Sequence, residues 1–294
     1  MTGILSVGVL ALLGSTLGWS CLDLLRKLLI RHATPAALLV WMTAGNAVLF
    51  LGWGLISGLV RPGPSYLAPA LGSILLNVVA NLAYFESVRV APLSTTVPLL
   101  SFTPVFATAF GWAALGETPR WTNVAGILLV VGGALLLSTA GGTSIAGVFT
   151  DRFKLRGSAL MLLVALLWAF SIGFDKLAIE RSNGPTHGVL LNAGLALATL
   201  AVMAPRRELG SLAAVKRVPG LLAGGVLVGF AALALQIVAL GVLWVSVIET
   251  VKRGMGNFLA VAFGRAFFGE PVTAIKLVAA LLMAVGVGLV LMGG

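Results

Sequence analysis

Ten apolar runs, each about as long as a membrane is thick, constrain this chain more than any other feature of its sequence. A bilayer core of about 30 Å needs roughly 20 apolar residues in a helix, because every backbone N–H and C=O in hydrocarbon must be paired within the segment. Only short gaps separate the runs, and several of them hold helix breakers: Ala33-Thr34-Pro35, Gly116-Glu117-Thr118-Pro119 and Gly184-Pro185 are examples. The runs predict transmembrane helices at residues 4–25, 35–60, 66–88, 92–115, 121–140, 157–180, 186–204, 219–241, 244–268 and 272–292.

The composition agrees with a chain that lies in lipid. Of its 294 residues, 59% are hydrophobic and only 10% are charged, whereas a soluble domain carries about 25% charged residues. The net charge of +10 would suggest nucleic acid in a soluble protein. Here most basic residues fall in the gaps between runs, where they face anionic headgroups. We expect a multi-pass protein of a cell inner membrane, with the lipid bilayer as a partner and no nucleic acid.

The residue types that enzymes and metal sites need are scarce. Cys21 is the one cysteine, so an internal disulfide is excluded, and two histidines, His32 and His187, do not make a zinc or iron site. The sequence lacks the motifs of serine hydrolases, phosphate-binding loops and zinc proteases, and it lacks a nucleotide domain. We expect no enzyme activity, no cofactor and no metal, and transport would run on a gradient or on exchange.

The second half of the chain repeats the first. Phe110–Glu117 aligns with Phe263–Glu270 at an offset of 153 residues, and five of the eight pairs are identical. Trp19 recurs as Trp168, each eight residues before a lysine. Each copy holds five spans, and an odd number makes the second copy enter the membrane from the opposite side.

The repeat predicts the architecture. We expect an all-α integral membrane protein with ten transmembrane helices in two inverted five-helix repeats. The first repeat would be residues 1–140 and the second 157–294, joined by a linker at 141–156. Such a pair places a shared cavity near the membrane midplane.

Four short motifs stand in order along nearly the whole chain. They are Trp168 to Asp175-Lys176 at the end of the sixth span, Asn81 with Tyr84 in the third, Pro98-Leu99-Leu100-Ser101-Phe102-Thr103-Pro104 in the fourth, and Gly-Glu before the fifth and tenth. With them the chain resembles the EamA-type branch of the drug/metabolite transporter superfamily. The resemblance implies a basket of ten helices whose cavity is lined mainly by helices one, three, four, six, eight and nine. Similar proteins export amino acids, including aromatic ones, and others carry nucleotide sugars, phosphorylated sugars or drugs, so the cargo stays open.

Three charged residues stand inside the ninth span, where each costs roughly 3 kcal/mol unless it faces a cavity or a partner. Glu249, Lys252 and Arg253 are spaced i, i+3 and i+4, so the acid lies beside both bases on one helix face. Two interpretations are open. The charges form a self-neutralised patch near the helix end, or one base pairs with Glu249 while the other binds a substrate carboxylate or phosphate.

Aromatic and amide side chains supply the other candidates. Trp19 and Trp168 take equivalent places in the two copies, either in an aromatic belt at the membrane interface or in the wall of a binding chamber. An Asn-Asn-Tyr stripe on the third span should face the cavity or another helix rather than lipid. The residues that we expect to bind substrate are Trp19, Asn77, Asn81, Tyr84, Trp168, Phe174, Glu249, Lys252 and Arg253.

The other polar residues of the spans favour structural roles. Gln236 is expected to form an interhelical hydrogen bond. Glu117 and Glu270 directly precede the fifth and tenth spans, where a carboxylate is favourable at a helix N-terminus. Ion pairs at helix ends, where long side chains reach water, are expected for Asp23 with Arg26, Asp175 with Lys176, and Glu86 with Arg89.

Together these features predict a secondary transporter that exports small metabolites, amino acids above all and aromatic ones among them, by alternating access through a central cavity. We expect a small-molecule substrate and a monomer. An exchanger of phosphorylated or other organic anions would use the same basic pair, and a polyspecific drug exporter would rely on Glu249 or Glu86. Outside transport, the alternatives are a membrane scaffold and an uncoupled channel. The distribution of basic residues places both termini outside, whereas the resemblance places them inside.

Overall fold

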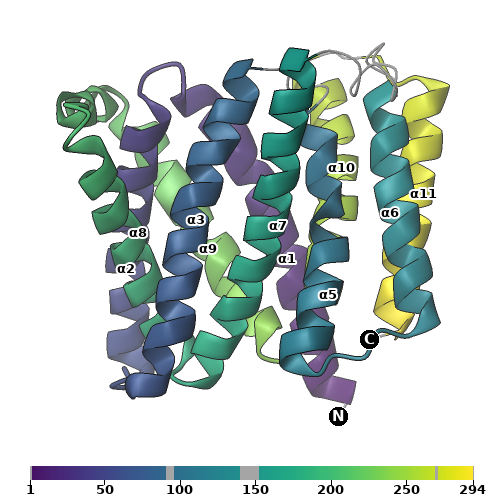
Figure 1. Ribbon diagram of the computed structural model, residues 1–294, viewed down its shortest axis with the longest axis horizontal. Coiled ribbons are helices and arrows are strands. Elements are labelled where there is room, and N and C mark those ends of the chain that lie inside the picture. Colours follow the sequence, from purple (N-terminus) through teal and green to yellow (C-terminus); the bar gives the residue numbers. More distant parts are fainter. Residues whose placement is uncertain (1, 91–95, 140–151, 269–270, 294) are drawn as a thin grey trace. The chain divides into compact units, whose positions relative to one another are not determined.

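Helices form nearly all of the chain that the structure, a computed structural model, describes: residues 2–90, 96–139, 152–268 and 271–293. No strand occurs in these ranges. Figure 1 shows the arrangement. The elements are α1 (Thr2–Leu29), α2 (Pro35–Ser57), α3 (Pro64–Val90), the 3-10 helix η1 (Val97–Phe102), α5 (Thr103–Leu115), α6 (Trp121–Thr139), α7 (Arg152–Glu180), α8 (Gly184–Met203), the 3-10 helix η3 (Leu209–Arg217), α9 (Pro219–Leu240), α10 (Val245–Phe268) and α11 (Ala274–Gly293).

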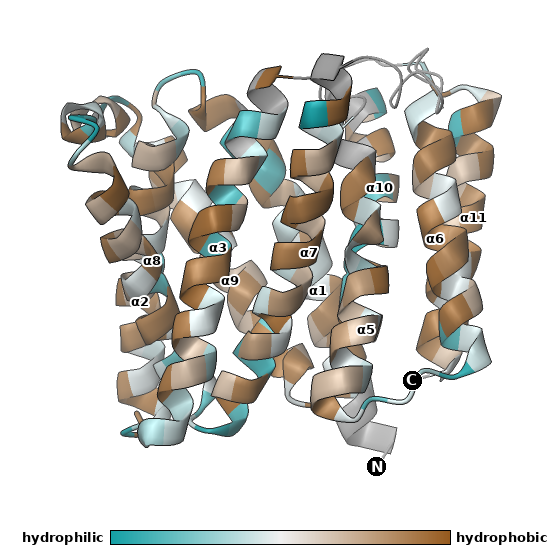
Figure 2. Cartoon of the chain, viewed as in Figure 1, coloured by the Kyte–Doolittle hydropathy of each residue, from teal (hydrophilic) through white to brown (hydrophobic). Residues whose placement is uncertain are grey.

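The described residues of each predicted span are mainly helical, and among the described residues eight helices are long and apolar enough to cross a membrane. Residues 92–95 and 140 of the predicted spans lie outside the described residues. Figure 2 shows how apolar these helices are along most of their length. The other two spans differ for physical reasons. The fourth is divided into η1 and the 13-residue α5, which has a proline in its first turn, and the ninth, α10, carries charges. The count of ten membrane crossings stays a prediction.

The predicted breakers begin and end helices as expected. Thr34 caps α2 by accepting a hydrogen bond from the Ala37 N–H, with a proline as the next residue. Asn183 caps α8 in the same way, accepting from the Thr186 N–H at 2.9 Å. Gly116 ends α5 in the left-handed region, at φ +68°, where a side chain would be strained.

The described helices pack into two compact units. Unit 1 contains Met1–Val78 and Phe174–Val242, and unit 2 contains Val79–Gly173 and Leu243–Gly294. Each unit draws helices from both predicted repeats, and α3 and α7 contribute a segment to each. The repeat boundaries therefore differ from the packing boundaries, and the repeat itself stays a prediction. Of the predicted linker at 141–156, residues 141–151 lie outside the described residues.

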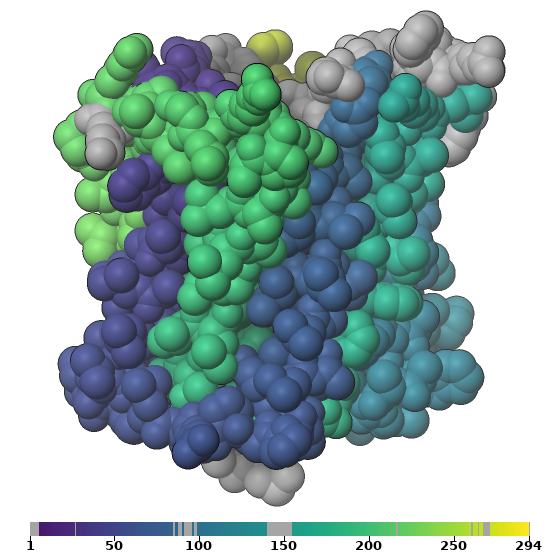
Figure 3. All heavy atoms as spheres, turned by 60° about the vertical axis from the view of Figure 1, so that its left-hand side comes forward, coloured from purple at the N-terminus to yellow at the C-terminus, as the bar shows by residue number. Residues whose placement is uncertain are grey.

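Within unit 1, α1 packs on α9 and α2 packs on α8. Figure 3 shows α8 beside α2 on one face of this unit. A Cβ added to Gly18 would lie 2.9 Å from the Ala232 Cβ, so glycine is needed where α1 and α9 approach most closely. Ser15 Oγ donates to the Ala232 carbonyl across the same contact, at 2.8 Å.

Within unit 2, α6 packs along α11, and α10 packs on α5, α6 and α11. A Cβ on Gly126 would lie 2.5 Å from the Gly286 carbonyl oxygen, so the backbones of α6 and α11 are in contact. Small residues at such contacts are how helices associate in lipid, where no hydrophobic effect drives them together.

Candidate functional site

The helix that carries the predicted charge cluster, α10, begins at a buried cap. The N–H of Val245, its first residue, donates to both carboxylate oxygens of Glu117 at 3.1 Å each. The sequence predicted a role for Glu117 at the N-terminus of α6, which begins four residues later, and the structure adds the N-terminus of α10. Packing brings the start of α10 to Glu117, a contact between residues 128 positions apart. Glu270 lies outside the described residues.

The three charges of α10 are in contact with one another inside unit 2. Glu249 is 1% exposed. Its Oε1 forms an ion pair with Lys252 Nζ, and its Oε2 lies 3.7 Å from Arg253 Nε. Both basic side chains are 19% exposed. One buried carboxylate therefore lies between two bases, and the group as a whole carries a formal charge of +1.

The hydrogen bonding of this group is incomplete. Glu249 Oε2 and Arg253 Nε are buried and have no hydrogen-bond partner among the described residues. The distance of 3.7 Å between them is too long for a hydrogen bond. A buried polar atom without a partner costs about 1–3 kcal/mol. Such an atom in a folded protein calls for an explanation, and a bound ligand is one.

Two aromatic rings lie beside the charges. The Arg253 Cζ is 5.7 Å from the centre of the Trp168 ring, within cation–π distance. The Trp168 ring is in turn 5.8 Å from the Tyr84 ring, with 33° between their planes. We name the five residues Tyr84, Trp168, Glu249, Lys252 and Arg253 the α10 cluster. The structure thus brings together five of the nine predicted substrate-binding residues, from α3, α7 and α10.

The backbone of α10 is held tightly at this cluster. A Cβ on Gly254 would lie 2.6 Å from Val287 Cγ2 and 3.2 Å from Val130 Cγ2, so α10 touches α11 and α6 next to the basic pair. One turn further on, Asn257 Nδ2 donates to Ser101 Oγ at 3.2 Å. These contacts fix the position from which the charged side chains project.

The remaining predicted residues have other surroundings. Asn81 is half-buried on the part of α3 that belongs to unit 2. In unit 1, Trp19 Nε1 donates to Gln236 Oε1 at 2.9 Å, which confirms the expected interhelical hydrogen bond of Gln236. Asn77 Nδ2 donates to the Ser73 carbonyl at 3.1 Å. The half-buried Phe174 ring packs against α3 at Gly72.

A polar network that the sequence did not predict joins α3, α7 and α8 in unit 1. Asp175 is 7% exposed, accepts a hydrogen bond from Ser73 Oγ and lies 3.2 Å from His187 Nε2. The other ring nitrogen of His187 is 3.2 Å from the Tyr66 hydroxyl. We name Tyr66, Ser73, Asn77, Asp175 and His187 the Asp175 network.

The expected place of Asp175, in a water-exposed pair with Lys176, was wrong because α3 and α8 cover this part of α7. The only sequence signal was an acid and a histidine at the ends of neighbouring apolar runs. Of the other expected end pairs, one is confirmed. Asp23 pairs with Arg26 at 3.3 Å on the surface, as expected. Glu86 pairs with Arg156 at 3.1 Å, and the side chain of Arg89 lies outside the described residues.

Comparison with known proteins finds a transporter family in the first half of the chain. Residues 6–139, just under half of its length, match the EamA-like transporter family. No curated protein sequence matches the chain. A solved crystal structure, called simply "Crystal structure of protein", shares the fold with a TM-score of 0.74 and 17% sequence identity, over 98% of this chain and 95% of the other.

Proposed function

We propose that the chain is a secondary transporter of a cell inner membrane that exports amino acids, aromatic ones among them, by alternating access. The observation that carries the proposal is the α10 cluster. It combines a net positive charge, a buried guanidinium nitrogen without a hydrogen-bond partner and a pair of aromatic rings. An aromatic amino acid offers the complementary groups: a carboxylate, an ammonium and an apolar ring.

Each part of the cluster has a role in this proposal. Arg253 binds the substrate carboxylate, since a guanidinium matches a carboxylate in charge and geometry. Glu249 holds both bases in place and attracts the substrate ammonium. Trp168 and Tyr84 form the wall against which the substrate side chain stacks. The two ion pairs of Glu249 offset part of the cost of burying its carboxylate.

One observation also favours a second candidate. Lys252 and Arg253 together would suit a phosphate group, which carries more charge than a carboxylate. An exchanger of phosphorylated or other organic anions would use the same bases but would have no need of the Trp168–Tyr84 pair. In a polyspecific drug exporter, by contrast, Glu249 would carry the cargo cation, and neutralising it alone would abolish transport.

Counterflow in liposomes tests these candidates. Purified protein is reconstituted with unlabelled amino acids inside, and uptake of labelled phenylalanine is measured against a panel of amino acids, phosphate esters and organic cations. We expect saturable exchange that other amino acids inhibit. Exchange with phosphate esters alone would move the cargo to the second candidate. Uptake that neither saturates nor shows counterflow would contradict a transporter and favour a channel or scaffold.

A further inference from the structure

The Asp175 network takes no part in the proposed substrate site, yet two of its titratable side chains, those of Tyr66 and His187, are almost fully buried. Tyr66 is 2% exposed, His187 0% and Ser73 0%. The hydrogen bonds run in one series from Tyr66 through His187 and Asp175 to Ser73, and on to Asn77. A carboxylate beside an imidazole in an apolar bundle is costly, so its presence calls for a function.

The network differs from an ion site because it is closed. None of its buried polar atoms lacks a hydrogen-bond partner among the described residues. Asp175 Oδ1 is already shared between Ser73 Oγ and His187 Nε2, so the groups bond to each other rather than surround a space. A metal ion needs several ligand oxygens around it. A proton needs only one lone pair that can accept it.

The same heavy-atom geometry suits two protonation states. With a neutral imidazole, Nε2–H donates to Asp175 and Nδ1 accepts from the Tyr66 hydroxyl. With one more proton, on Nδ1, both ring nitrogens donate, and the Tyr66 oxygen turns from donor to acceptor. The series of hydrogen bonds is preserved in both states. Its net charge changes from −1 to 0, because the imidazolium then neutralises the Asp175 carboxylate.

Few other charges act on this network. The elements packed around it, α2, α8, α9 and the part of α3 in unit 1, contain no titratable side chain besides Tyr66 and His187. The unit 1 segment of α7 adds Lys176 and Glu180. Arg181 follows on the loop, where its Nη1 donates to the Ser65 carbonyl at 2.8 Å.

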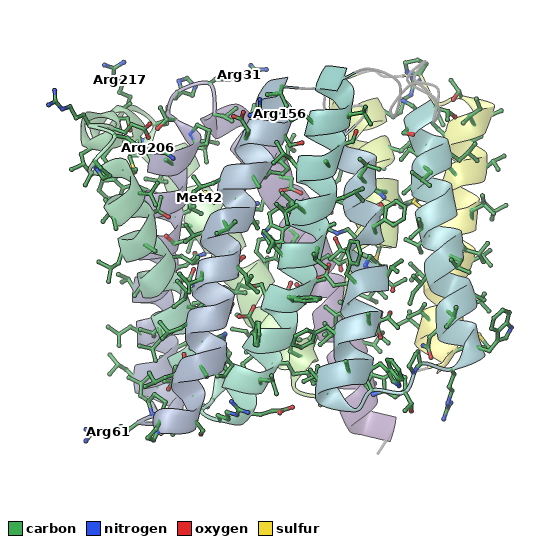
Figure 4. The ribbon with its side chains drawn as sticks, in the orientation of Figure 1. Arg31, Met42, Arg61, Arg156, Arg206 and Arg217 are labelled. Atoms are coloured by element: carbon green, nitrogen blue, oxygen red, sulfur yellow. The ribbon has the colours of Figure 1, made fainter. Side chains whose placement is uncertain are left out.

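The network lies toward one end of the helices that form it. Figure 4 shows Arg61 at this end and Arg31, Arg206 and Arg217 at the opposite end. Tyr66 lies five residues after Arg61, and His187 lies in the first turn of α8. Asp175 lies five residues, about 7.5 Å, before the end of α7. Its side chain is 10% exposed.

We propose that the Asp175 network is a proton-binding site, and that the proton it binds is the one coupled to transport. Binding of the proton stands independently, whereas coupling rests on the proposed transport function. The proton enters from water, occupies His187 Nδ1 and is held there by Tyr66, while Asp175 stabilises the imidazolium. Because α3, α7 and α8 each supply a member, the charge of the site acts on the contact between three helices.

Two histidines in the chain make a direct test simple. In a His32→Gln background with ¹⁵N-histidine label, the imidazole signals come from His187 alone. In phosphatidylcholine nanodiscs, we expect these signals to change from the neutral to the protonated pattern as the pH falls from about 9 to about 5. With Asp175→Asn added, the protonated pattern should be weaker at a given pH, because the carboxylate that stabilises the imidazolium is gone. Signals that do not change with pH, or that change identically in Asp175→Asn, overturn the proposal.

Tyr66→Phe provides a second variant in case Asp175→Asn fails to fold. It removes the oxygen that accepts from the protonated ring and leaves the aromatic packing, so the protonated fraction at a given pH should fall. An unchanged titration in Tyr66→Phe would contradict the role of the hydroxyl and, with it, the closed network that we infer.

Coupling is tested in liposomes that contain a pH-sensitive dye. Addition of the amino acid that exchanges best should change the internal pH with wild-type protein. Asp175→Asn should keep counterflow at equal pH but lose the substrate-driven pH change, and the exposed control Asp23→Asn should keep both. A substrate-driven pH change that persists in Asp175→Asn overturns coupling. Absence of wild-type counterflow would reject the proposed function, while the histidine titration still decides whether the site binds a proton.

Discussion

The α10 cluster and the Asp175 network differ in where their polar side chains come from and in how completely these are hydrogen-bonded. In the α10 cluster, all three charges come from neighbouring turns of one helix, the net charge is +1, and two buried atoms have no hydrogen-bond partner among the described residues. In the Asp175 network, the polar groups come from three helices, and each buried polar atom has a partner there. An open group of fixed charge is suited to a ligand. A closed group with a histidine is suited to a proton.

The difference also teaches what each group does for the fold. Glu249 holds two bases on its own helix, so the cluster adds little to the contact between helices. Ser73, Asp175 and His187 each belong to a different helix, so their bonds join α3, α7 and α8. We therefore expect damage to the first group to act mainly through an unpaired buried charge, and damage to the second to loosen helix packing.

The largest effect is expected for Glu249→Gln. It leaves two bases buried without their carboxylate, and breaking a buried pair in this way costs about 3–5 kcal/mol. The free energy of unfolding in mixed micelles measures the loss. The matched control is Asp23→Asn, whose pair with Arg26 is exposed and worth at most about 1 kcal/mol. If the two variants lose similar amounts of unfolding free energy, the ion pairs of the α10 cluster are no more protected from solvent than a surface pair.

Ser73→Ala should come next. It removes the hydroxyl that donates to the Asp175 carboxylate, and a hydrogen bond to a charged group contributes about 1.5–3 kcal/mol. The same unfolding measurement applies, with Ser138→Ala as the control, since Ser138 donates only to a carbonyl of its own helix. If Ser73→Ala costs no more than the control, the network does not join α3 to α7.

Gly254→Ala tests whether α10 is held rigidly at the basic pair. The new Cβ would lie 2.6 Å from Val287 Cγ2, and overpacking of this kind costs about 1–3 kcal/mol. Gly132→Ala on α6, where no atom lies within 4 Å of the new Cβ, should instead gain up to about 1 kcal/mol from helix propensity. Equal effects at the two glycines would mean that α10 is free to shift.

The neutral hydrogen bond between Trp19 and Gln236 is a reference against which the energies of the α10 cluster and the Asp175 network can be compared. Trp19→Phe removes the bond to Gln236 and should cost about 0.6 kcal/mol, the average for such bonds between membrane helices. A double-mutant cycle with Gln236→Leu isolates the pair. A coupling energy as large as that of Glu249 with its bases would erase the contrast between charged and neutral contacts.

Sequence periodicity predicted the features that depend on residues close together in the chain. The apolar runs and their breakers located the helices, because helix length and capping depend on neighbouring residues. The spacing of Glu249, Lys252 and Arg253 predicted their contact for the same reason. The division of the fourth span into η1 and α5 was missed, although Pro98 and Pro104 were visible in the sequence, because both prolines lie in an otherwise unbroken apolar run.

Contacts between helices far apart in the sequence could not be predicted from spacing. The contact of Asp175 with Ser73 joins residues 102 positions apart, and no spacing rule links them. The same holds for Glu117, whose carboxylate caps α10, which begins 128 positions further along the chain. In both cases the sequence showed a polar residue at the end of an apolar run, and only the fold showed what it faces.

The central claim is that Arg253 in the α10 cluster binds the carboxylate of the substrate. Counterflow of labelled phenylalanine, competed by phenylalanine or by phenylethylamine, which lacks the carboxylate, tests it most directly. We expect wild-type protein and the exposed control Arg206→Gln to prefer phenylalanine by about 10- to 100-fold, as a hydrogen bond to a charged group implies, and Arg253→Gln to lose that preference. An Arg253→Gln protein that still prefers the carboxylate as strongly as wild type would contradict the account.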